Sequence, residues 1–404
     1  MLRLHLRVMF PIILLLFLSG CWDQSEIKEQ AIVIGIGIDK IPGNGAILLT
    51  AQVINPAASK NGNQGTSGSG TTGTTGGTSQ ATGSIVIETS TGRSFDDAIR
   101  NFLKYSSRRV IFFHNRIIIF GKTLAESGIA GILDCMARDS QFRRTNWLLV
   151  AEANAREILQ SKTGLGSYPA QEINQMMINL VKRAFFLPVT LNDFLTGMYS
   201  EGKTSLMPMV AVGAPGTDPG QGGIQLERTA VFKNDRLIDV LTVEESQGLL
   251  WLADKQKGGS LVFPFQTGKG RKTISVAIMN GSTKIYPRIT PEGILMDIFC
   301  TGTGTLRESE GLKNNPRTIQ QLERRVESIL KNRLERTIQK AQQIKADFPG
   351  FATLIHGEDP ERWRRIKPDW GAEFPRIRTK IRFQINIAGF GLIKDSVAKP
   401  ARQE

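Results

Sequence analysis

The sequence predicts an α+β protein made of three mixed α/β domains, each a mostly antiparallel sheet packed with helices, after a cleaved signal peptide. Three observations lead to this prediction. The chain has 404 residues, more than a single domain usually holds. Short runs of alternating apolar residues are mixed with longer segments of helical periodicity. A short apolar run near the beginning of the chain ends in small residues and a cysteine.

Residues 1–20 have the features of a bacterial lipoprotein signal peptide. Two arginines form a positive n-region, and the apolar run at 8–18 would form a helix of about 16 Å, roughly half of the hydrocarbon thickness of a bilayer. The run is therefore too short to span and is typical of a cleaved segment. The sequence LSGC follows and resembles a lipobox. Cleavage after Gly20 would leave Cys21 to carry an N-acyl group and an S-diacylglycerol; an ordinary signal sequence with a chance cysteine is the alternative.

Residues 21–155 are predicted to form the N-terminal domain. The stretch at 59–83 is rich in Gly, Ser and Thr and has almost nothing to bury, so we expect a disordered insertion between two strands. Ser94 is a candidate cap for a helix whose buried face would hold Phe95, Ala98, Ile99, Phe102 and Leu103. The remaining pattern predicts one helix at 123–139 and strands at 31–40, 46–55, 84–90, 116–121 and 146–152.

The middle domain is predicted to cover residues 156–267. Its main break is the Gly/Pro-rich segment at 213–223. The apolar patterns predict helices around 170–183, 190–199 and 243–254 and strands near 204–213 and 227–241.

The C-terminal domain is predicted to cover residues 268–404. A long amphipathic helix is expected at 316–346, with Asn315 as its cap and Pro316 in its first turn. We expect its apolar stripe to pack on a sheet rather than to form a coiled coil. The last strand, at 376–389, alternates strictly, so that one face would be core and the other basic.

The basic face of that last strand is a candidate contact surface. It would present Arg376, Arg378, Lys380 and Arg382, which fit an anionic membrane surface or an acidic partner. An ordinary solvated face is the alternative. The whole chain has a formal charge of +14, which also favours anionic partners without choosing among them. The basic residues are spread along the chain without a recognition module, so we expect no nucleic-acid binding.

The sequence offers little for catalysis or for cofactors. Three cysteines and three histidines lie far apart, without the ligand spacing of a metal site or a disulfide framework. GMYSEGKT at 197–204 matches the P-loop pattern, but a helical pattern precedes it and a strand pattern follows, the reverse of a phosphate-binding loop. No G-x-S-x-G motif occurs. We therefore expect no ATP, no cofactor, no metal and no enzymatic activity.

Several motifs, in their order along the chain, resemble one family. They are GCWDQSEI, then GID with Asp39, then SRRVIFFHNRIIIFGKTLAESGI, then TAVFKNDRLIDVLTVEESQGLLWL, and finally DFPGF with Trp363 or Trp370. Together they are similar to the C subunits of spore germinant receptors, the Ger(x)C lipoproteins. The break at 213–223 falls where that family would divide into N- and C-terminal parts.

The resemblance implies a role as well as a fold. It implies a lipoprotein on the outer face of the spore inner membrane, one that acts with A-type and B-type membrane subunits when a nutrient starts germination of a bacterial endospore. It also implies three mixed α/β domains and no catalytic residues. The alternative is a substrate-binding lipoprotein of a transporter. Such proteins usually have two similar lobes, and the sequence pattern does not show them. A cell-wall hydrolase is disfavoured because no site for that reaction is recognisable.

Overall fold

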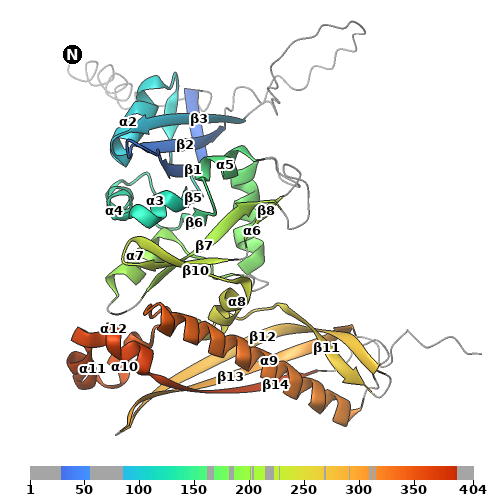
Figure 1. The fold of residues 1–404 in the computed structure, drawn as a ribbon. Helices are drawn as coiled ribbons and strands as arrows, with labels where there is room; N and C mark the ends of the chain where they lie inside the picture. The colour runs from blue at the N-terminus through green and yellow to red at the C-terminus, as the bar shows by residue number, and fades with distance from the viewer. Residues whose placement is uncertain are drawn as a thin grey trace, which may run out of the picture.

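A computed structural model shows a mixed α/β fold in which helices pack on two sheets (Figure 1). It describes residues 29–54, 85–161, 168–181, 186–200, 202, 204–213, 223–226, 228–267, 270–290, 292–308, 312 and 315–388. The predicted signal peptide at 1–20, Cys21 and the predicted insertion at 59–83 lie outside these residues. The predicted class, mixed α/β with helices packed on sheets, is confirmed.

The first sheet has ten strands. They are β1 (Gln30–Lys40), β2 (Ile47–Ile54), β3 (Ile85–Gly92), β4 (Arg109–Ile111), β5 (Ile117–Phe120), β6 (Trp147–Ala151), β7 (Ser205–Val212), β8 (Ile224–Gln225), β9 (Thr229–Lys233) and β10 (Arg236–Leu241). The main order is β10-β9-β7-β6-β5-β1-β2-β3, with β4 beside β1 and β8 beside β7. The pairs from β1 through β5 and β6 to β7 are parallel and the outer pairs are antiparallel, so the sheet is mixed.

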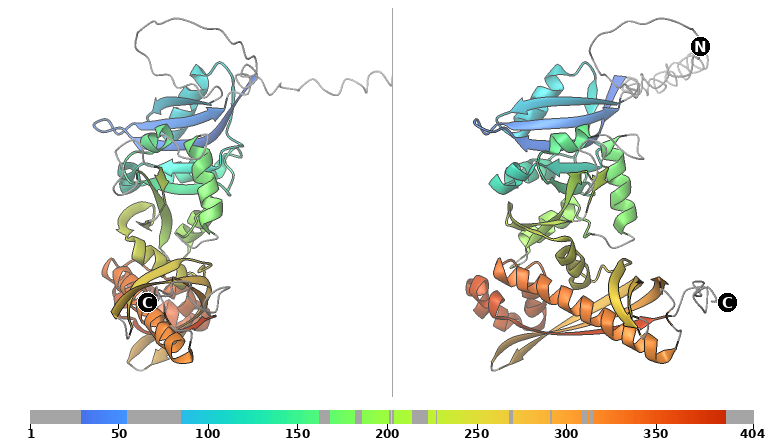
Figure 2. Two further views of the ribbon diagram at one scale, coloured as in Figure 1. Left: turned by 90° about the vertical axis from the view of Figure 1, so that its right-hand side faces the viewer. Right: turned by 45° about the vertical axis from the view of Figure 1, so that its right-hand side comes forward.

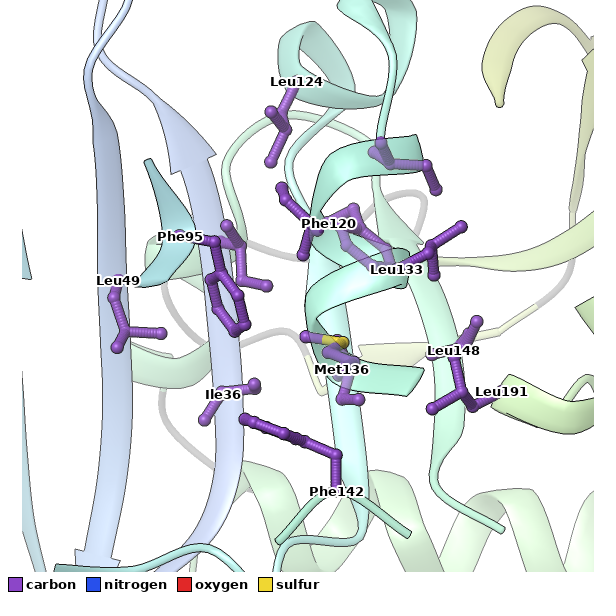
Figure 3. Close-up of a cluster of buried hydrophobic side chains, with 14 of the residues drawn as sticks. Ile36, Leu49, Phe95, Phe120, Leu124, Leu133, Met136, Phe142, Leu148 and Leu191 are labelled. Carbon is purple, nitrogen blue, oxygen red and sulfur yellow. The ribbon is translucent and has the colours of Figure 1, made fainter. Parts of the chain in front are cut away.

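Helices cover both faces of this sheet. They are α2 (Phe95–Tyr105), α3 (Lys122–Ser127), α4 (Ala130–Arg138), α5 (Ala155–Gln160), α6 (Pro169–Val181) and α7 (Leu191–Tyr199). Alternate residues of β5 show the two layers: Ile118 and Phe120 join the cluster under α2, α3, α4 and α7, whereas Ile117 and Ile119 pack under α5 and α6. Figure 3 shows the first of these clusters. β5 therefore has the continuous apolar sequence of a strand that is buried on both sides.

The predicted helix at 123–139 is wrong in one respect, because it is two helices. α3 ends before Gly128, whose φ of 111° is a conformation that side chains rarely adopt. The chain then restarts as α4, whose first amide, that of Ala130, donates to a carboxylate oxygen of Asp235 at 3.0 Å. Asp235 lies in the turn between β9 and β10, and this turn also divides the single strand predicted at 227–241 into a hairpin.

The second sheet has four strands in the order β11-β12-β13-β14. They are β11 (Ser260–Thr267), β12 (Gly270–Thr290), β13 (Gly293–Glu308) and β14 (Arg378–Ile387). The helices of this part are α8 (Val243–Leu252), α9 (Pro316–Gln343), α10 (Phe351–Glu358), α11 (Pro360–Ile366) and α12 (Trp370–Glu373), with 3-10 turns at η3 (Lys367–Asp369) and η4 (Phe374–Arg376). The sequence pattern places residues 260–267 in the middle domain without indicating a strand there, and it indicates none of the helices after α9.

α9 begins as the sequence predicts. The side chain of Asn315 accepts the amide of Thr318 at 2.9 Å, and Pro316 occupies the first turn. The apolar stripe of the helix packs on β14 and the neighbouring strands, so the expected helix-on-sheet packing is confirmed; the stripe consists of Leu322, Val326, Leu330, Leu334, Ile338 and Ala341. One face of the second sheet is therefore core, and none of the described helices covers the other (Figures 1 and 2).

The two sheets meet through α8, which follows β10 directly and packs on α9. Trp251 at the end of α8 is 2% exposed and lies in the same apolar cluster as Val231 and Leu241 of the first sheet. Lys340 of α9 also pairs with Asp239 of β10 at 2.7 Å. The molecule is elongated, with β1, β2, β3 and α2 at one end and the second sheet at the other (Figures 1 and 2).

The division into three domains stays a prediction. The first sheet continues across residues 155 and 156, where a boundary was expected, and β11 joins the second sheet although it precedes residue 268. The change from one sheet to the other falls between Leu241 and Ser260, around α8.

The contact between α8 and α9 can be tested at Gly248. A Cβ atom at this position would lie 2.1 Å from Oγ1 of Thr337, so Gly248→Ala overpacks the junction. We expect the free energy of unfolding to fall by about 1–3 kcal/mol in chemical denaturation. The control is Gly131→Ala in the exposed part of α4, where nothing lies within 4 Å; it should leave stability unchanged or raise it by up to about 1 kcal/mol. Equal stability of the two variants would contradict the close packing.

Candidate functional site

The motif GID, one of those that carry the family resemblance, has a structural role. Asp39 is 6% exposed, and its two carboxylate oxygens accept the amides of Ala155 and Arg156, the first two residues of α5, at 2.8 and 2.9 Å. Burial raises the pKa of Asp39, while these two amides oppose the rise. Two residues earlier, Gly37 leaves room for Ala155, which would lie 3.0 Å from an added Cβ. The motif thus seats α5 on β1.

DFPGF has the same kind of role. Asp347 is 2% exposed and accepts the amides of Gly350, Phe351 and Ala352 at 2.7–2.9 Å. These N–H groups at the beginning of α10 have no partner within the helix, and the carboxylate provides one. Burial raises the pKa of Asp347 to about 6, and the three amides limit the rise. Gly350 supplies the left-handed turn, with φ 78°, that aims these amides at the carboxylate.

The P-loop-like segment does not form a phosphate cradle from the residues that the structure describes. Gly197 lies inside α7, and the chain then enters β7 at Ser205, so no helix follows the segment. Gly202 packs against Ala352 and Trp363, which would lie 2.6 and 3.0 Å from an added Cβ. Lys203 lies outside the described residues. The predicted order of helix, loop and strand is confirmed.

Within the described residues, no three side chains of His, Cys, Asp or Glu gather closely enough to hold a metal ion. None of the helices in the described ranges combines the length and the apolar character needed to cross a bilayer. Cys21, the predicted lipidation site, is not among the residues described.

The four basic residues predicted as a contact surface lie at the edge of the second sheet. Arg378, Lys380 and Arg382 are exposed on the face of β14 that α9 does not cover, whereas Arg376 belongs to the preceding 3-10 turn. Arg376 pairs with Glu373 at 3.3 Å and Arg378 with Glu292 at 3.0 Å. Two of the residues that the sequence predicts as contacts for other molecules therefore form ion pairs within the chain.

Arg382 belongs to a network that the sequence did not reveal. Asp297 of β13 is 3% exposed although it lies on the uncovered face, and its oxygens bind Arg288 of β12 and Arg382 of β14, each at 2.8 Å. The guanidinium of Arg382 also lies 5.8 Å from the ring centroid of Phe299. One carboxylate thus joins three adjacent strands, and Lys380, opposite Asp297 in the register, is the member of the predicted set that makes no ion pair with the described residues.

A signal for Asp297 existed in the sequence. Ile294, Met296 and Ile298 alternate as core residues, which places Asp297 on the opposite face as an acid within an apolar run. Its two arginines could not be identified, because strand order and register decide which side chains meet.

α9 also binds the outer edge of β14, the last strand of the second sheet. The backbone amides on this edge have no partner strand among the described residues. Two of them donate to α9: Ile385 to Glu327 and Ile387 to Glu323, each at 2.9 Å. The same helix that covers the apolar face therefore also satisfies part of the edge backbone.

A crevice of about 680 Å³ lies where the two sheets meet. Its apolar wall comes from both sides of the junction, with Phe194 of α7, Leu252 of α8, Ile285 of β12 and Phe348 before α10. The volume is that of a small-molecule pocket, and such pockets often lie between domains.

The charged groups of the crevice are Asp193, Asp254 and Lys255. Asp193 is occupied by the capping box of α7, and Asp254 accepts the amide of Thr283 at 2.8 Å. Lys255 is exposed and makes no ion pair within the described part of the chain. The crevice therefore combines an apolar wall with a few polar and charged groups, as sites for small molecules do.

The Asp297 network can be tested by its stability. Asp297→Asn keeps the shape of the side chain but removes the charge that Arg288 and Arg382 share. We expect the free energy of unfolding to fall by about 2 kcal/mol, since hydrogen bonds to charged groups contribute about 1.5–3 kcal/mol. The control is Arg378→Gln, which breaks an exposed ion pair and should cost about 0.5 kcal/mol or less. If both variants unfold at the same denaturant concentration, the network does not stabilise the sheet.

Comparison with known proteins agrees with this architecture. Residues 23–212 match the family model described as the spore germination protein N-terminal domain, and residues 227–391 match the model described as spore germination B3/GerAC-like, C-terminal. Spore germination protein KC of Bacillus subtilis (strain 168) is 24% identical over 413 residues, 97% of each chain. Spore germination protein YndF of the same strain is 25% identical over 404 residues, 95% of this chain and 96% of the relative.

A solved structure shows the same fold. The crystal structure of the GerBC protein superposes with a TM-score of 0.52 at 19% sequence identity, covering 91% of this chain and 100% of that one. The two family matches together cover all of the chain from β1 to β14 except residues 213–226, which lie between the matches. The chain therefore belongs to the Ger(x)C family, the C subunits of spore germinant receptors, and has a role in spore germination.

Proposed function

We propose that this chain is a non-catalytic lipoprotein subunit of a nutrient germinant receptor. Acyl chains on Cys21 hold it on the outer face of the spore inner membrane, where it assembles with the A-type and B-type membrane subunits. The observation that carries the proposal is the sequence LSGC directly after a short apolar run, in a chain of this family. A diacylglyceryl group inserts two chains, and two chains anchor a protein stably.

The uncovered face of the second sheet supports assembly with a partner protein. Arg378, Lys380 and Arg382 of β14 project from this face. Tyr286 of β12 lies on the same face and is 54% exposed. Basic and aromatic side chains on a rigid strand suit contact with an acidic protein surface. The ion pairs of Arg378 and Arg382 within the chain hold these side chains in place, and Lys380 is left for the partner.

The anchor is tested in spores by Cys21→Ala. Without the thiol no thioether can form, so we expect the protein to remain unprocessed or to leave the membrane fraction, and the response to one nutrient to be lost. The matched control is Cys135→Ala, which removes a half-buried thiol from α4 and should leave both localisation and germination unchanged. Mature, membrane-bound Cys21→Ala protein would contradict the lipoprotein assignment.

The crevice between the sheets favours a second candidate function, direct binding of a small nutrient. Single amino acids and sugars, each added to the purified protein, should then raise its melting temperature in proportion to log concentration above the dissociation constant. Thr353→Trp would fill the crevice from its exposed rim and should abolish the shift without altering the unliganded melting temperature. Absence of a shift for every compound, or a shift that survives Thr353→Trp, would count against the crevice.

A further inference from the structure

One end of the molecule combines exposed apolar, aromatic and basic side chains close to where the chain arrives from Cys21. β1 begins at Gln30, and the nine steps from Cys21 to this residue reach at most about 30 Å. β4 runs parallel to β1 with Arg109 opposite Gln30, so the loop that leads into β4 lies at this same end. That loop connects to α2, which ends at Tyr105.

This end exposes an aromatic and an aliphatic side chain next to each other. Tyr105 is 80% exposed and Leu103 is 43% exposed. Helical periodicity predicts a buried Leu103, and the structure corrects this prediction: Phe95, Ala98, Ile99 and Phe102 are buried, but Leu103 lies at the margin of that stripe. Nζ of Lys104 stays 5.6 Å from the ring centroid of Tyr105, so a cation and an aromatic ring are presented together.

Charge is distributed unevenly along α2. At its beginning, Asp96 pairs with Arg100 at 3.0 Å and Asp97 with Arg93 at 3.6 Å, so the acids are compensated there. At its end the basic residues Lys104, Arg108 and Arg109 follow one another closely, with Glu29 as the neighbouring acid before Gln30. Lys104 also suits the negative end of the helix dipole, but Arg108 and Arg109 lie beyond the helix, where this explanation does not apply.

We propose that this N-terminal tip, formed by Leu103, Lys104, Tyr105 and Arg109, rests on the surface of an anionic phospholipid bilayer. The inference rests on the proposed lipid anchor, which keeps the tip near the membrane. Tyrosine with an adjacent aliphatic side chain suits the headgroup region, where one side of the ring is apolar and the hydroxyl is wet. Basic residues within a Debye length of about 8 Å are attracted to anionic lipid.

The position of the tip favours it over the basic face of β14 as the membrane contact. β1 and β10 are five strand spacings apart, about 24 Å, and the second sheet lies beyond β10 (Figure 1). A molecule that stands on its N-terminal tip therefore holds β14 away from the bilayer, where a partner can reach it. Arg376, Arg378 and Arg382 are also paired within the chain, whereas Arg109 makes no ion pair with the described residues.

The experiment measures the partition of protein onto vesicles without the lipid anchor. The full mature chain with Cys21→Ser, which cannot be acylated, is sedimented with vesicles of equal parts phosphatidylglycerol and phosphatidylcholine. We expect binding at low salt, loss of binding to pure phosphatidylcholine, and about fivefold weaker partition for each basic residue neutralised, so about 25-fold for Lys104→Gln with Arg109→Gln. Tyr105→Ser should weaken binding at high salt as well as at low salt, because its contribution is apolar.

The matched control is Arg378→Gln with Lys380→Gln, which removes the same charge at the other end of the molecule and should change partition less than twofold. The tip proposal is overturned if the unacylated chain does not sediment with anionic vesicles, or if the two double variants lose binding equally. It is also overturned if Lys104→Gln with Arg109→Gln keeps vesicle binding but no longer co-purifies with the membrane subunits, which would make the tip a protein contact. Failure of the anchor alone would show instead as release of the otherwise unchanged chain from spore membranes while vesicle binding persists.

Discussion

The close packing of α8 on α9 is the contact on which the relation between the two sheets depends. α8 follows β10 after a single residue, Thr242, so its direction is set by the first sheet, and Gly248 lets the backbone approach Thr337 of the second part. The apolar cluster around Trp251 then includes residues of both sheets. Domains joined by small polar interfaces usually move, but a shared apolar core resists that motion. The shared core holds the two walls of the crevice together, and the N-terminal tip and β14 lie in parts at opposite ends of the molecule (Figure 1).

Two carboxylates of the family motifs, Asp39 and Asp347, are buried and cap helices. Asp39 accepts amides from the beginning of α5, which is far away in sequence, and Asp347 accepts amides from the beginning of α10, which follows directly. A buried charge is tolerated only when it is paired or hydrogen bonded, and a helix N-terminus provides several amides together with a favourable dipole. These two residues therefore hold α5 and α10 in place, and the motifs that contain them have a structural role. The proposed contacts lie elsewhere, at the two ends of the molecule and in the crevice between the sheets.

Much of the fold could be predicted from local sequence, because local chemistry decides it. Ser94 and Asn315 cap the helices that follow them, as expected, and the strict alternation of β14 separates its core face from its basic face. The break at Gly128 was missed because the residue that caps α4, Asp235, is 105 positions away. The partners of Arg378 and Arg382 were missed for the same reason: only strand order brings Glu292 and Asp297 beside them. Leu103 was misplaced because periodicity cannot tell the centre of an apolar stripe from its margin. Cys21 remains a prediction from its sequence motif, and the insertion at 59–83 remains a prediction from composition.

The two glutamates of α9 that accept the amides of Ile385 and Ile387 have a consequence for assembly. An open strand edge is a template for another strand, and proteins concentrated on a membrane are exposed to that hazard. A second strand would have to displace these two carboxylates from the backbone of β14 before it could extend the sheet by hydrogen bonds. The basic side chains of β14 add electrostatic repulsion between identical edges. These features disfavour edge-to-edge pairing of β14 between copies of this protein on one surface. A partner that binds β14 would contact its side chains rather than its backbone.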